Sequence, residues 1–328
     1  MYQSMQHAAL AVAMAAGGSL ALAPLAAKAD YPAQPIKIVV PFAAGGPSDG
    51  LGRIVAQGLA EALNATVVVE NRPGAGGNIG TAYAAKAPAD GYTLVVGYIG
   101  SLAINPELFE ALPYDPLTDL APIAFLAGNP LVLVTRPGFQ VPDLEALKRA
   151  SRAAAAGLSY GSGGVGSANH MAAVLFGKAA GIQAVHVPYK GAAPATMALL
   201  GDQVDFMLNG MSVALPHIQD GKLHALAVTT AERVDSMPDL PTLEELGVAP
   251  FDVSAWFGLL APAGTPAEVL GALEAATLEV LGSPEVQTQL ASMGFVPRLM
   301  GQAEFGEFMR REHALWSQVV RDSGARVD

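Results

Sequence analysis

Residues 36–50 read IKIVVPFAAGGPSDG, an apolar, β-branched strand that runs into a glycine-rich loop with one serine. An apolar helical segment to about residue 63 and a second β-branched strand at 66–69 follow. This order predicts a βαβ unit of a parallel sheet, with the loop at the carboxyl edge of the first strand. Free N–H groups in the loop and the positive end of the helix dipole favour a small anion there.

A second stretch repeats this plan in the middle of the chain. Strand 158–160 leads into the loop GSGGVGS at 161–167, a helical segment at 170–180 and a strand at 184–187. Each unit aims a glycine-rich loop and a helix end at one place, so each can hold an anion without a charged side chain. Two such units predict two lobes, with a ligand clamped between the two loops.

The remaining chain alternates strands and helices, which predicts a doubly wound, mostly parallel sheet covered on both faces. Further strands are predicted at 93–97, 123–127, 131–135, 203–209, 223–229 and 253–260, and helices at 81–86, 143–156, 194–200, 266–281 and 304–322, with one short helix within 238–250. We expect the chain to cross between lobes near 129–134 and 252–257. Lobe 1 then comprises 30–131 and 253–328, and lobe 2 comprises 132–252.

Composition excludes several classes of protein. The 328 residues are 52% hydrophobic and carry a net charge of −11, with no cluster of Lys and Arg. A large core and two domains are expected, and a nucleic-acid surface is not. The chain has no cysteine, and its histidines lack the spacing of a metal site, so we expect no metal and no cofactor.

The N-terminus has the features of a signal peptide. Residues 8–27 are almost wholly apolar and end in Ala27-Lys28-Ala29, a small-x-small signature. We expect cleavage after Ala29 and a mature protein in the periplasm. The alternative is an uncleaved membrane anchor, which Gly17-Gly18 and Pro24 disfavour.

Ser48 lies in Gly46-Pro47-Ser48-Asp49-Gly50, which matches the G-x-S-x-G elbow of serine hydrolases between a strand and a helix. In that fold the nucleophile follows several earlier strands, whereas Ser48 follows the first strand of the mature chain. The alternatives are that Ser48 or Asp49 caps the helix, with or without a ligand. An exported hydrolase using Ser48 therefore stays the second hypothesis.

Gly161-x-Gly163-x-x-Gly166 matches the dinucleotide fingerprint G-x-G-x-x-G, also between a strand and a helix. A dinucleotide fold places an acidic residue at the end of the next strand, for the ribose hydroxyls. Here that strand ends in Val187-Pro188-Tyr189-Lys190. Binding of a simple anion by the same loop is the better interpretation.

These residues belong to a longer series of motifs that covers the mature chain in order: YPxxPI at 31–36, PFAAGGxSDxxxR at 41–53, VENRPGAGG at 69–77, DGYTL at 90–94, YDP at 114–116, SxGxGSxxH at 162–170, HVPYKG at 186–191, LAVT at 226–229 and PAGTP at 262–266. In this series the chain resembles the extracytoplasmic solute receptors of the tripartite tricarboxylate transporter system, also called Bug receptors. The resemblance implies a two-lobe, Venus-flytrap (type II) periplasmic binding protein, with no catalytic residues.

The resemblance also implies a ligand and partners. The protein would close on a small carboxylate, namely a di- or tricarboxylate, an acidic amino acid or an aromatic acid, and deliver it to a two-subunit membrane permease. A monomer is expected. The family often has threonine where this chain has Ser48 after Pro47, so the identity of the ligand does not transfer.

We expect the carboxylate to lie between the two loops, where Ser48 and Ser167 donate to it and Asp49 caps the helix and orients Ser48. The predicted ligand-binding residues are Phe42, Gly46, Pro47, Ser48, Asp49, Tyr98, Ser101, Ser162, Gly164, Val165, Gly166, Ser167, His170 and Asn209.

Overall fold

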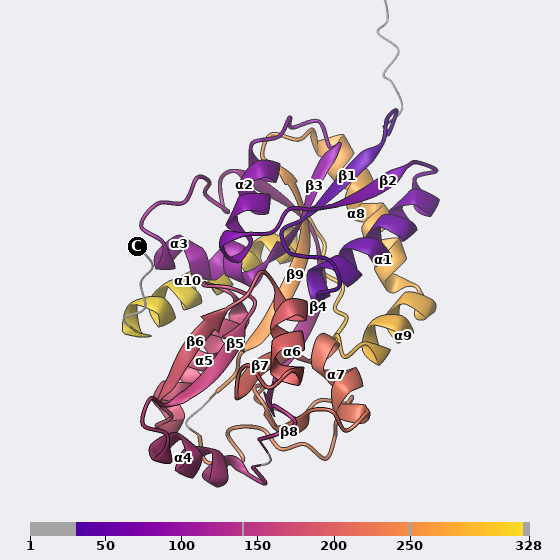
Figure 1. Cartoon of the computed structure of the whole chain (residues 1–328). Helices are drawn as coiled ribbons and strands as arrows, with labels where there is room; N and C mark the ends of the chain where they lie inside the picture. The colour runs from indigo at the N-terminus through magenta and orange to yellow at the C-terminus, as the bar shows by residue number, and fades with distance from the viewer. Residues whose placement is uncertain (1–30, 140, 249–250, 324–328) are drawn as a thin grey trace, which may run out of the picture. The chain divides into compact units, whose positions relative to one another are not determined.

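The computed structural model describes residues 31–139, 141–248 and 251–323 (Figure 1). The expected signal peptide, residues 1–29, lies outside the described residues, so its cleavage after Ala29 stays a prediction. Residues Pro32–Asp328 belong to one compact unit, which holds the helices and strands of the described part.

The strands are β1 (Ile36–Val40), β2 (Val67–Asn71), β3 (Thr93–Tyr98), β4 (Leu120–Thr135), β5 (Leu158–Ser162), β6 (Ala184–Pro188), β7 (Phe206–Gly210), β8 (His224–Val228) and β9 (Ser254–Pro262). The helices are α1 (Pro47–Ala62), α2 (Asn78–Ala85), α3 (Asn105–Leu108), α4 (Leu144–Ala153), α5 (Ala168–Ala180), α6 (Ala192–Leu200), α7 (Met211–Gln219), α8 (Ala267–Gly282), α9 (Pro284–Ser292) and α10 (Gln302–Ser323), with a 3₁₀ turn η1 (Ala75–Gly77) and a π turn η2 (Gly100–Ile104).

The strands form one mixed sheet in the order β2-β1-β3-β9-β4-β7-β5-β6, and β8 pairs with β4. The predicted βαβ units are present, because β1 runs parallel to β2 and β3, and β5 runs parallel to β6 and β7. The sheet is less parallel than expected, since β9 is antiparallel to β3, and β4 is antiparallel to β7, β8 and β9. We call β1, β2, β3 and β9 the first half of the sheet and β5, β6, β7 and β8 the second half.

Strand β4 joins the two halves. Its residues Leu120–Pro130 pair with β9, Leu131–Thr135 pair with β7, and Val132–Thr135 also pair with β8 (Figure 1). The change of partner falls within 129–134, where a crossing between lobes was expected. β4 is continuous across it, although the sequence predicted two strands, because Asn129 and Pro130 are still paired with β9. The boundaries of the two lobes stay a prediction.

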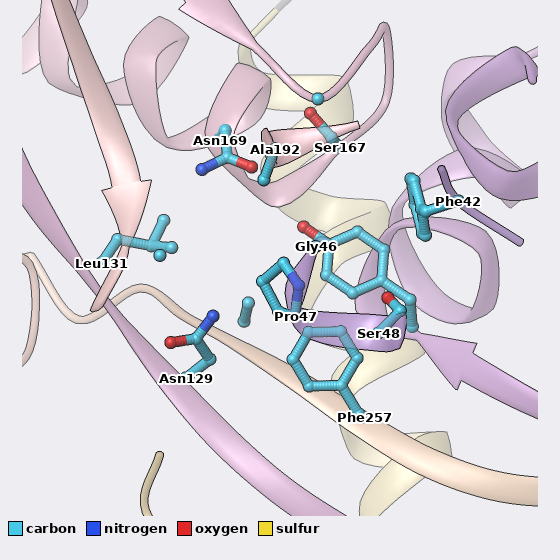
Figure 2. A pocket seen from close by; sticks show the side chains of 14 residues that line it. Phe42, Gly46, Pro47, Ser48, Asn129, Leu131, Ser167, Asn169, Ala192 and Phe257 are labelled. Atoms are coloured by element: carbon cyan, nitrogen blue, oxygen red, sulfur yellow. The ribbon is translucent and has the colours of Figure 1, made fainter. Parts of the chain in front are cut away.

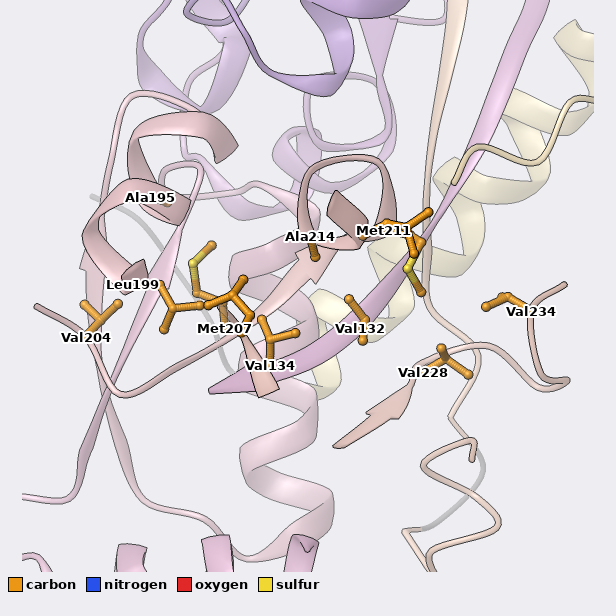
Figure 3. Packing of buried hydrophobic residues seen from close by; sticks show 12 residues of the cluster. Val132, Val134, Ala195, Leu199, Val204, Met207, Met211, Ala214, Val228 and Val234 are labelled. Atoms are coloured by element: carbon orange, nitrogen blue, oxygen red, sulfur yellow. The ribbon is translucent and has the colours of Figure 1, made fainter. Parts of the chain in front are cut away.

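Each half has its own apolar layer. In the first half, Leu51, Val55 and Leu59 of α1 are fully buried, at the spacing that places one face of a helix on a sheet. In the second half, a cluster lies between the end of β4, β7 and β8 on one side and α6 and α7 on the other (Figure 3). Its members are Val132, Val134, Ala195, Leu199, Val204, Met207, Met211, Ala214, Leu215, Leu223, Val228 and Val234.

Several elements differ from the sequence predictions. α7 and α9 were not predicted, and neither was the helical segment formed by η2 and α3. The short helix expected within 238–250 is absent from the described residues there, which form turns. α7 starts directly after β7, with no loop between Gly210 and Met211, so the sequence offered no boundary signal.

Candidate functional site

Helix α1 begins at the first glycine-rich loop and brings Ser48 to a cavity. Gly46 is the N-cap residue, with an extended backbone (φ −89°, ψ 175°), and Pro47 is the first helical residue. Proline suits that position because its missing N–H would have had no partner in the helix. Ser48 is buried, and its hydroxyl has no hydrogen-bond partner among the described residues. The loop therefore presents an unpaired hydroxyl at the positive end of α1.

Asp49 is bonded to its own loop and to β2. Its Oδ2 accepts from the Gly45 N–H and from Arg53 Nε, both at 3.0 Å, and its Oδ1 accepts from Asn71 Nδ2 at 2.9 Å. Burial raises the pKa of this carboxyl, but the hydrogen bonds from Arg53, Gly45 and Asn71 together lower it by more. The pKa therefore lies below its ordinary value. The charged form is therefore stabilised.

This geometry corrects one expected role. Neither Asp49 nor Ser48 is the N-cap residue of α1, and no hydrogen bond joins these two residues in the described structure. Asp49 instead reaches back from the first helical turn to the N–H of the residue before the cap. It holds the shape of the loop that carries Ser48.

The second loop leads into α5 in the same way. Ser167 is the N-cap residue, and its Oγ accepts from the His170 N–H at 3.3 Å. This leaves the hydroxyl hydrogen of Ser167 available to an acceptor in the cavity. Gly164 (φ +122°) and Gly166 (φ +77°) turn the loop through conformations that favour glycine.

A cavity of about 30 Å³ lies between the two helix starts (Figure 2). Its lining comes from both halves of the sheet and consists of Phe42, Gly46, Pro47, Ser48, Tyr98, Asn129, Leu131, Gly163, Ser167, Asn169, Ala192, Gly210, Ala255 and Phe257. Figure 2 shows Phe42 and Ser48 on one side of the space and Asn129, Leu131 and Asn169 on the other. Two glycine-rich loops that are far apart in the sequence thus meet at one cavity.

Six predicted site residues line this cavity: Phe42, Gly46, Pro47, Ser48, Tyr98 and Ser167. The other eight are not among the lining residues, namely Asp49, Ser101, Ser162, Gly164, Val165, Gly166, His170 and Asn209. Each polar one forms at least one bond to a neighbouring protein group, although Asn209 Oδ1 has no partner among the described residues. Ser101 Oγ donates to the Tyr98 carbonyl at 3.2 Å, and Asn209 Nδ2 donates to Thr196 Oγ1 at 2.8 Å.

Sequence reasoning missed eight lining residues: Asn129, Leu131, Gly163, Asn169, Ala192, Gly210, Ala255 and Phe257. Asn129, Ala255 and Phe257 come from β4 and β9, whose pairing joins residues more than 100 positions apart. The sequence offered a partial signal, because both strands overlap the expected crossings between lobes at 129–134 and 252–257. It did not indicate which of their side chains line the cavity. Asn169 is adjacent to the predicted His170 on the first turn of α5.

Aromatic rings form one wall of the cavity. The Tyr98 ring lies 5.2 Å from the Phe42 ring, edge to face, and 5.2 Å from the Phe257 ring. Its hydroxyl oxygen accepts from the Ala168 N–H at 2.8 Å, a donor in the first turn of α5 that has no partner within the helix. Burial raises the pKa of the Tyr98 hydroxyl, so it stays protonated at neutral pH. Tyr98 therefore links the end of β3 to the start of α5.

The cavity wall offers backbone and neutral polar groups. None of the described residues that line it has a charged side chain. Two helix N-termini, those of α1 and α5, reach it with their partial positive charges. This arrangement suits an anion that accepts hydrogen bonds from hydroxyl and N–H groups.

Two histidines support the second loop from outside the cavity. The His170 and His186 rings stack at 4.1 Å, Gly166 N donates to His170 Nδ1 at 3.2 Å, and His186 Nε2 lies 2.6 Å from Ser162 Oγ. Burial lowers the pKa of both imidazoles to about 4, and for His170 the neighbouring His186 makes a smaller contribution to that shift. Both rings are therefore neutral near pH 7, as the acceptor role of His170 requires.

The two halves touch each other beside the cavity. A Cβ at Gly76 (φ +63°), next to α2, would collide with the Val165 carbonyl oxygen, and one at Gly166 would collide with Asn105 Oδ1. Together with the bond from Ala168 to Tyr98, these contacts hold the second loop against the first half. The cavity is correspondingly small, far below the roughly 300–1,000 Å³ of typical ligand pockets.

Two further properties of the described residues bear on function. No helix among them combines the length and apolarity needed to cross a bilayer. Within the same ranges, no three His, Cys, Asp or Glu side chains are grouped so that they could hold a metal ion.

Known proteins resemble this chain along most of its length. A family model described as "Tripartite tricarboxylate transporter family receptor" matches residues 51–325. Protein BugT of Bordetella pertussis (strain Tohama I) is 37% identical over 298 residues, which cover 90% of this chain and 91% of BugT.

Solved structures agree with this assignment. The periplasmic binding protein BugD superposes with a TM-score of 0.86 at 34% identity, over 90% of this chain and 99% of BugD. R. palustris Rpa4515, solved with adipate, superposes with a TM-score of 0.88 at 33% identity, over 91% of this chain and 100% of that protein. The chain therefore belongs to the receptor family of the tripartite tricarboxylate transporters and has the two-lobe fold of a periplasmic binding protein.

Proposed function

We propose that this receptor captures a small carboxylate in the cavity between α1 and α5 and delivers it to a membrane permease. The observation that supports the proposal most strongly is the convergence of two helix N-termini, each with a serine, on one cavity without charged side chains. A carboxylate there would accept hydrogen bonds from Ser48 and Ser167, and the positive ends of the two helices would stabilise its charge. Rpa4515, a relative of this chain, was solved with adipate.

Capture requires the two halves to move apart. A cavity of about 30 Å³ has room for about two water molecules, at 10–15 Å³ for each. A carboxylate of several carbons needs more space, so it would enter an opened cavity and then be enclosed as the halves approach again. β4 and the segment that leads into β9 join the halves and would act as the hinge, which is the usual behaviour of domains joined by two segments.

Binding is tested first with a thermal-shift panel of citrate, glutamate, adipate, nicotinate and terephthalate, because a ligand that binds only the folded state raises the melting temperature. Calorimetry then gives the Kd of the best ligand for the wild type and for Ser48→Ala and Ser167→Ala. A hydrogen bond to a carboxylate contributes about 1.5–3 kcal/mol, so each substitution should weaken binding by roughly 10- to 150-fold.

Ser292→Ala is the matched control, because Ser292 is exposed at the end of α9 and should leave the Kd unchanged. Unaltered affinity in the Ser48→Ala and Ser167→Ala variants would contradict the proposed site. Steady ester hydrolysis that is lost in Ser48→Ala would instead favour a serine hydrolase.

Export and delivery are separate parts of the proposal. We propose that the mature receptor is a periplasmic monomer that starts at Asp30 and works with a permease of two subunits. Intact-mass analysis of protein released from the periplasm tests the cleavage site after Ala29. A retained N-terminus in a membrane fraction would contradict cleavage. Uptake of the labelled ligand by cells with and without the receptor tests delivery.

A further inference from the structure

The far side of the cavity carries two neutral amide side chains, Asn129 and Asn169, opposite Phe42 and Ser48 (Figure 2). We infer that they read the end of the ligand remote from its carboxylate and select a neutral group that both accepts and donates a hydrogen bond, such as a carboxamide. The inference rests on the proposed function, because it takes the carboxylate to lie near Ser48 and Ser167. The ligand class is then a monocarboxylate with a polar, uncharged end.

Asn129 offers a donor to the cavity. Its Oδ1 accepts from the Ser212 N–H at 3.1 Å, and since an N–H can bond only to an acceptor, this contact fixes the orientation of the amide. The nitrogen Nδ2 has no acceptor among the described residues, and in Figure 2 it points toward Pro47. Asn129 is 1% exposed and lines the cavity, so its free donor is directed to the cavity and not to bulk solvent.

Gly210 makes room for this amide. A Cβ at residue 210 would collide with Asn129 Nδ2. The backbone there (φ −62°, ψ 132°) is one that any residue can adopt, so the close approach of Asn129 is the reason for glycine. A methyl group at this position should displace the Asn129 donor, although residue 129 itself is unchanged.

Asn169 offers the complementary acceptor. Its Nδ2 donates to the Leu208 carbonyl at 2.6 Å, which fixes this amide in the opposite sense. Its Oδ1 therefore faces the cavity, and Figure 2 shows that oxygen directed toward Ala192 and Ser167. The far side thus presents one donor and one acceptor, both anchored by backbone groups.

A second carboxylate would fit this end poorly. No Lys, Arg or His is among the described lining residues, and the oxygen of Asn169 would face the carboxylate oxygens. Leaving the Asn129 donor or the Asn169 acceptor unpaired in a buried site is unfavourable. A carboxamide satisfies both, because its carbonyl accepts from Asn129 and its N–H donates to Asn169. Between the two ends, Tyr98 and Phe257 contact an apolar body.

The test uses ligands that differ only at the far end. Adipamate, adipate and 6-aminohexanoate share one six-carbon chain and end in a carboxamide, a carboxylate and an ammonium group. Terephthalate and 4-carbamoylbenzoate form a matched aromatic pair. Calorimetry on the wild-type protein should give a Kd at least ~10-fold lower for a carboxamide than for the matching dicarboxylate. In the dicarboxylate, the oxygens of the second carboxylate would face the Asn169 Oδ1 acceptor without a hydrogen between them.

Asn129→Asp changes the selectivity without removing the anchor, because a carboxylate oxygen still accepts from the Ser212 N–H. The cavity then has two acceptors and a negative charge at its far side. 6-Aminohexanoate should become the tightest ligand of the aliphatic set, and adipate should lose the most affinity. Gly210→Ala should weaken adipamate binding ~10-fold by displacing the donor. Asn64→Asp, an exposed change after α1, should alter none of the three affinities.

The outcomes distinguish a failure of the inference from a failure of the proposed function. Adipate or terephthalate binding as tightly as its carboxamide, or an unchanged ligand order in Asn129→Asp, would overturn the inference and leave carboxylate capture intact. Failure of every carboxylate to bind the wild type, in this set and in the earlier panel, would overturn both.

Discussion

Tyr98→Phe removes one oxygen from the contact that ties the two halves together at the cavity. The phenyl ring keeps its packing against Phe42 and Phe257, at 5.2 Å from each. The Ala168 N–H, which bonds to the Tyr98 hydroxyl at 2.8 Å, is left without a partner. An unsatisfied buried N–H costs about 1–3 kcal/mol. If the bond forms when the halves close on a ligand, affinity should fall by roughly 5- to 150-fold.

Calorimetry with the best ligand of the panel measures this change in Kd, and thermal unfolding without ligand shows whether the free protein is affected. Tyr114→Phe is the matched control. The Tyr114 hydroxyl is bonded within the first half, to Asn78 Oδ1 at 3.0 Å and to the Ser101 carbonyl at 2.8 Å. Tyr114→Phe should therefore lower the melting temperature of the free protein and leave the Kd almost unchanged.

Two results would contradict this role of Tyr98. One is a Kd for Tyr98→Phe within twofold of the wild-type value. The other is a loss of stability in the ligand-free protein as large as in the complex, because the bond would then exist without closure.

Three other predictions concern the loops. His170 and His186 have pKa values lowered to about 4 from 6.5, so the unfolded chain binds more protons than the folded one between these pH values. The urea midpoint should therefore be constant above pH 6.5 and fall as the pH is lowered from 6.5 to 4. This fall should be smaller in the double variant His170→Gln/His186→Gln. Asp49→Asn should lower the free energy of unfolding by about 1–3 kcal/mol, measured in urea, because a buried carboxylate that accepts three hydrogen bonds is lost; an unchanged midpoint would argue against its role in the loop. Gly166→Ala should weaken ligand binding and lower the melting temperature, since Gly166 has φ +77° and no room for a Cβ. Gly271→Ala in α8, where nothing lies within 4 Å, should instead raise stability by about 0.5–1 kcal/mol.

The fold was largely predictable because its units are local. In both βαβ units, strand, glycine loop and helix follow one another within about 30 residues, and the parallel pairs formed by β1 and β5 are as expected. The antiparallel pairs of β4 with β7, β8 and β9 depend on contacts between distant segments. No local pattern encodes which strand lies beside β4, so the single long strand and the mixed sheet were missed.

The same division explains the site. Ser48 and Ser167 were placed at the cavity because each starts a helix after a glycine loop, a position that sequence reveals. Asn129 and Phe257 reach the cavity through the pairing of β4 with β9. His170, the last residue of the motif SxGxGSxxH, was predicted to bind the ligand but supports the loop from outside the cavity. Its neighbour Asn169 lines the cavity.

A crystal structure of the protein with its tightest-binding carboxylate from the panel would show where the two loops hold the anion. We expect one carboxylate group between the starts of α1 and α5, with Ser48 and Ser167 bonded to it directly or through one water molecule. A carboxylate bound elsewhere, or one that contacts only one of the two helix starts, would contradict it.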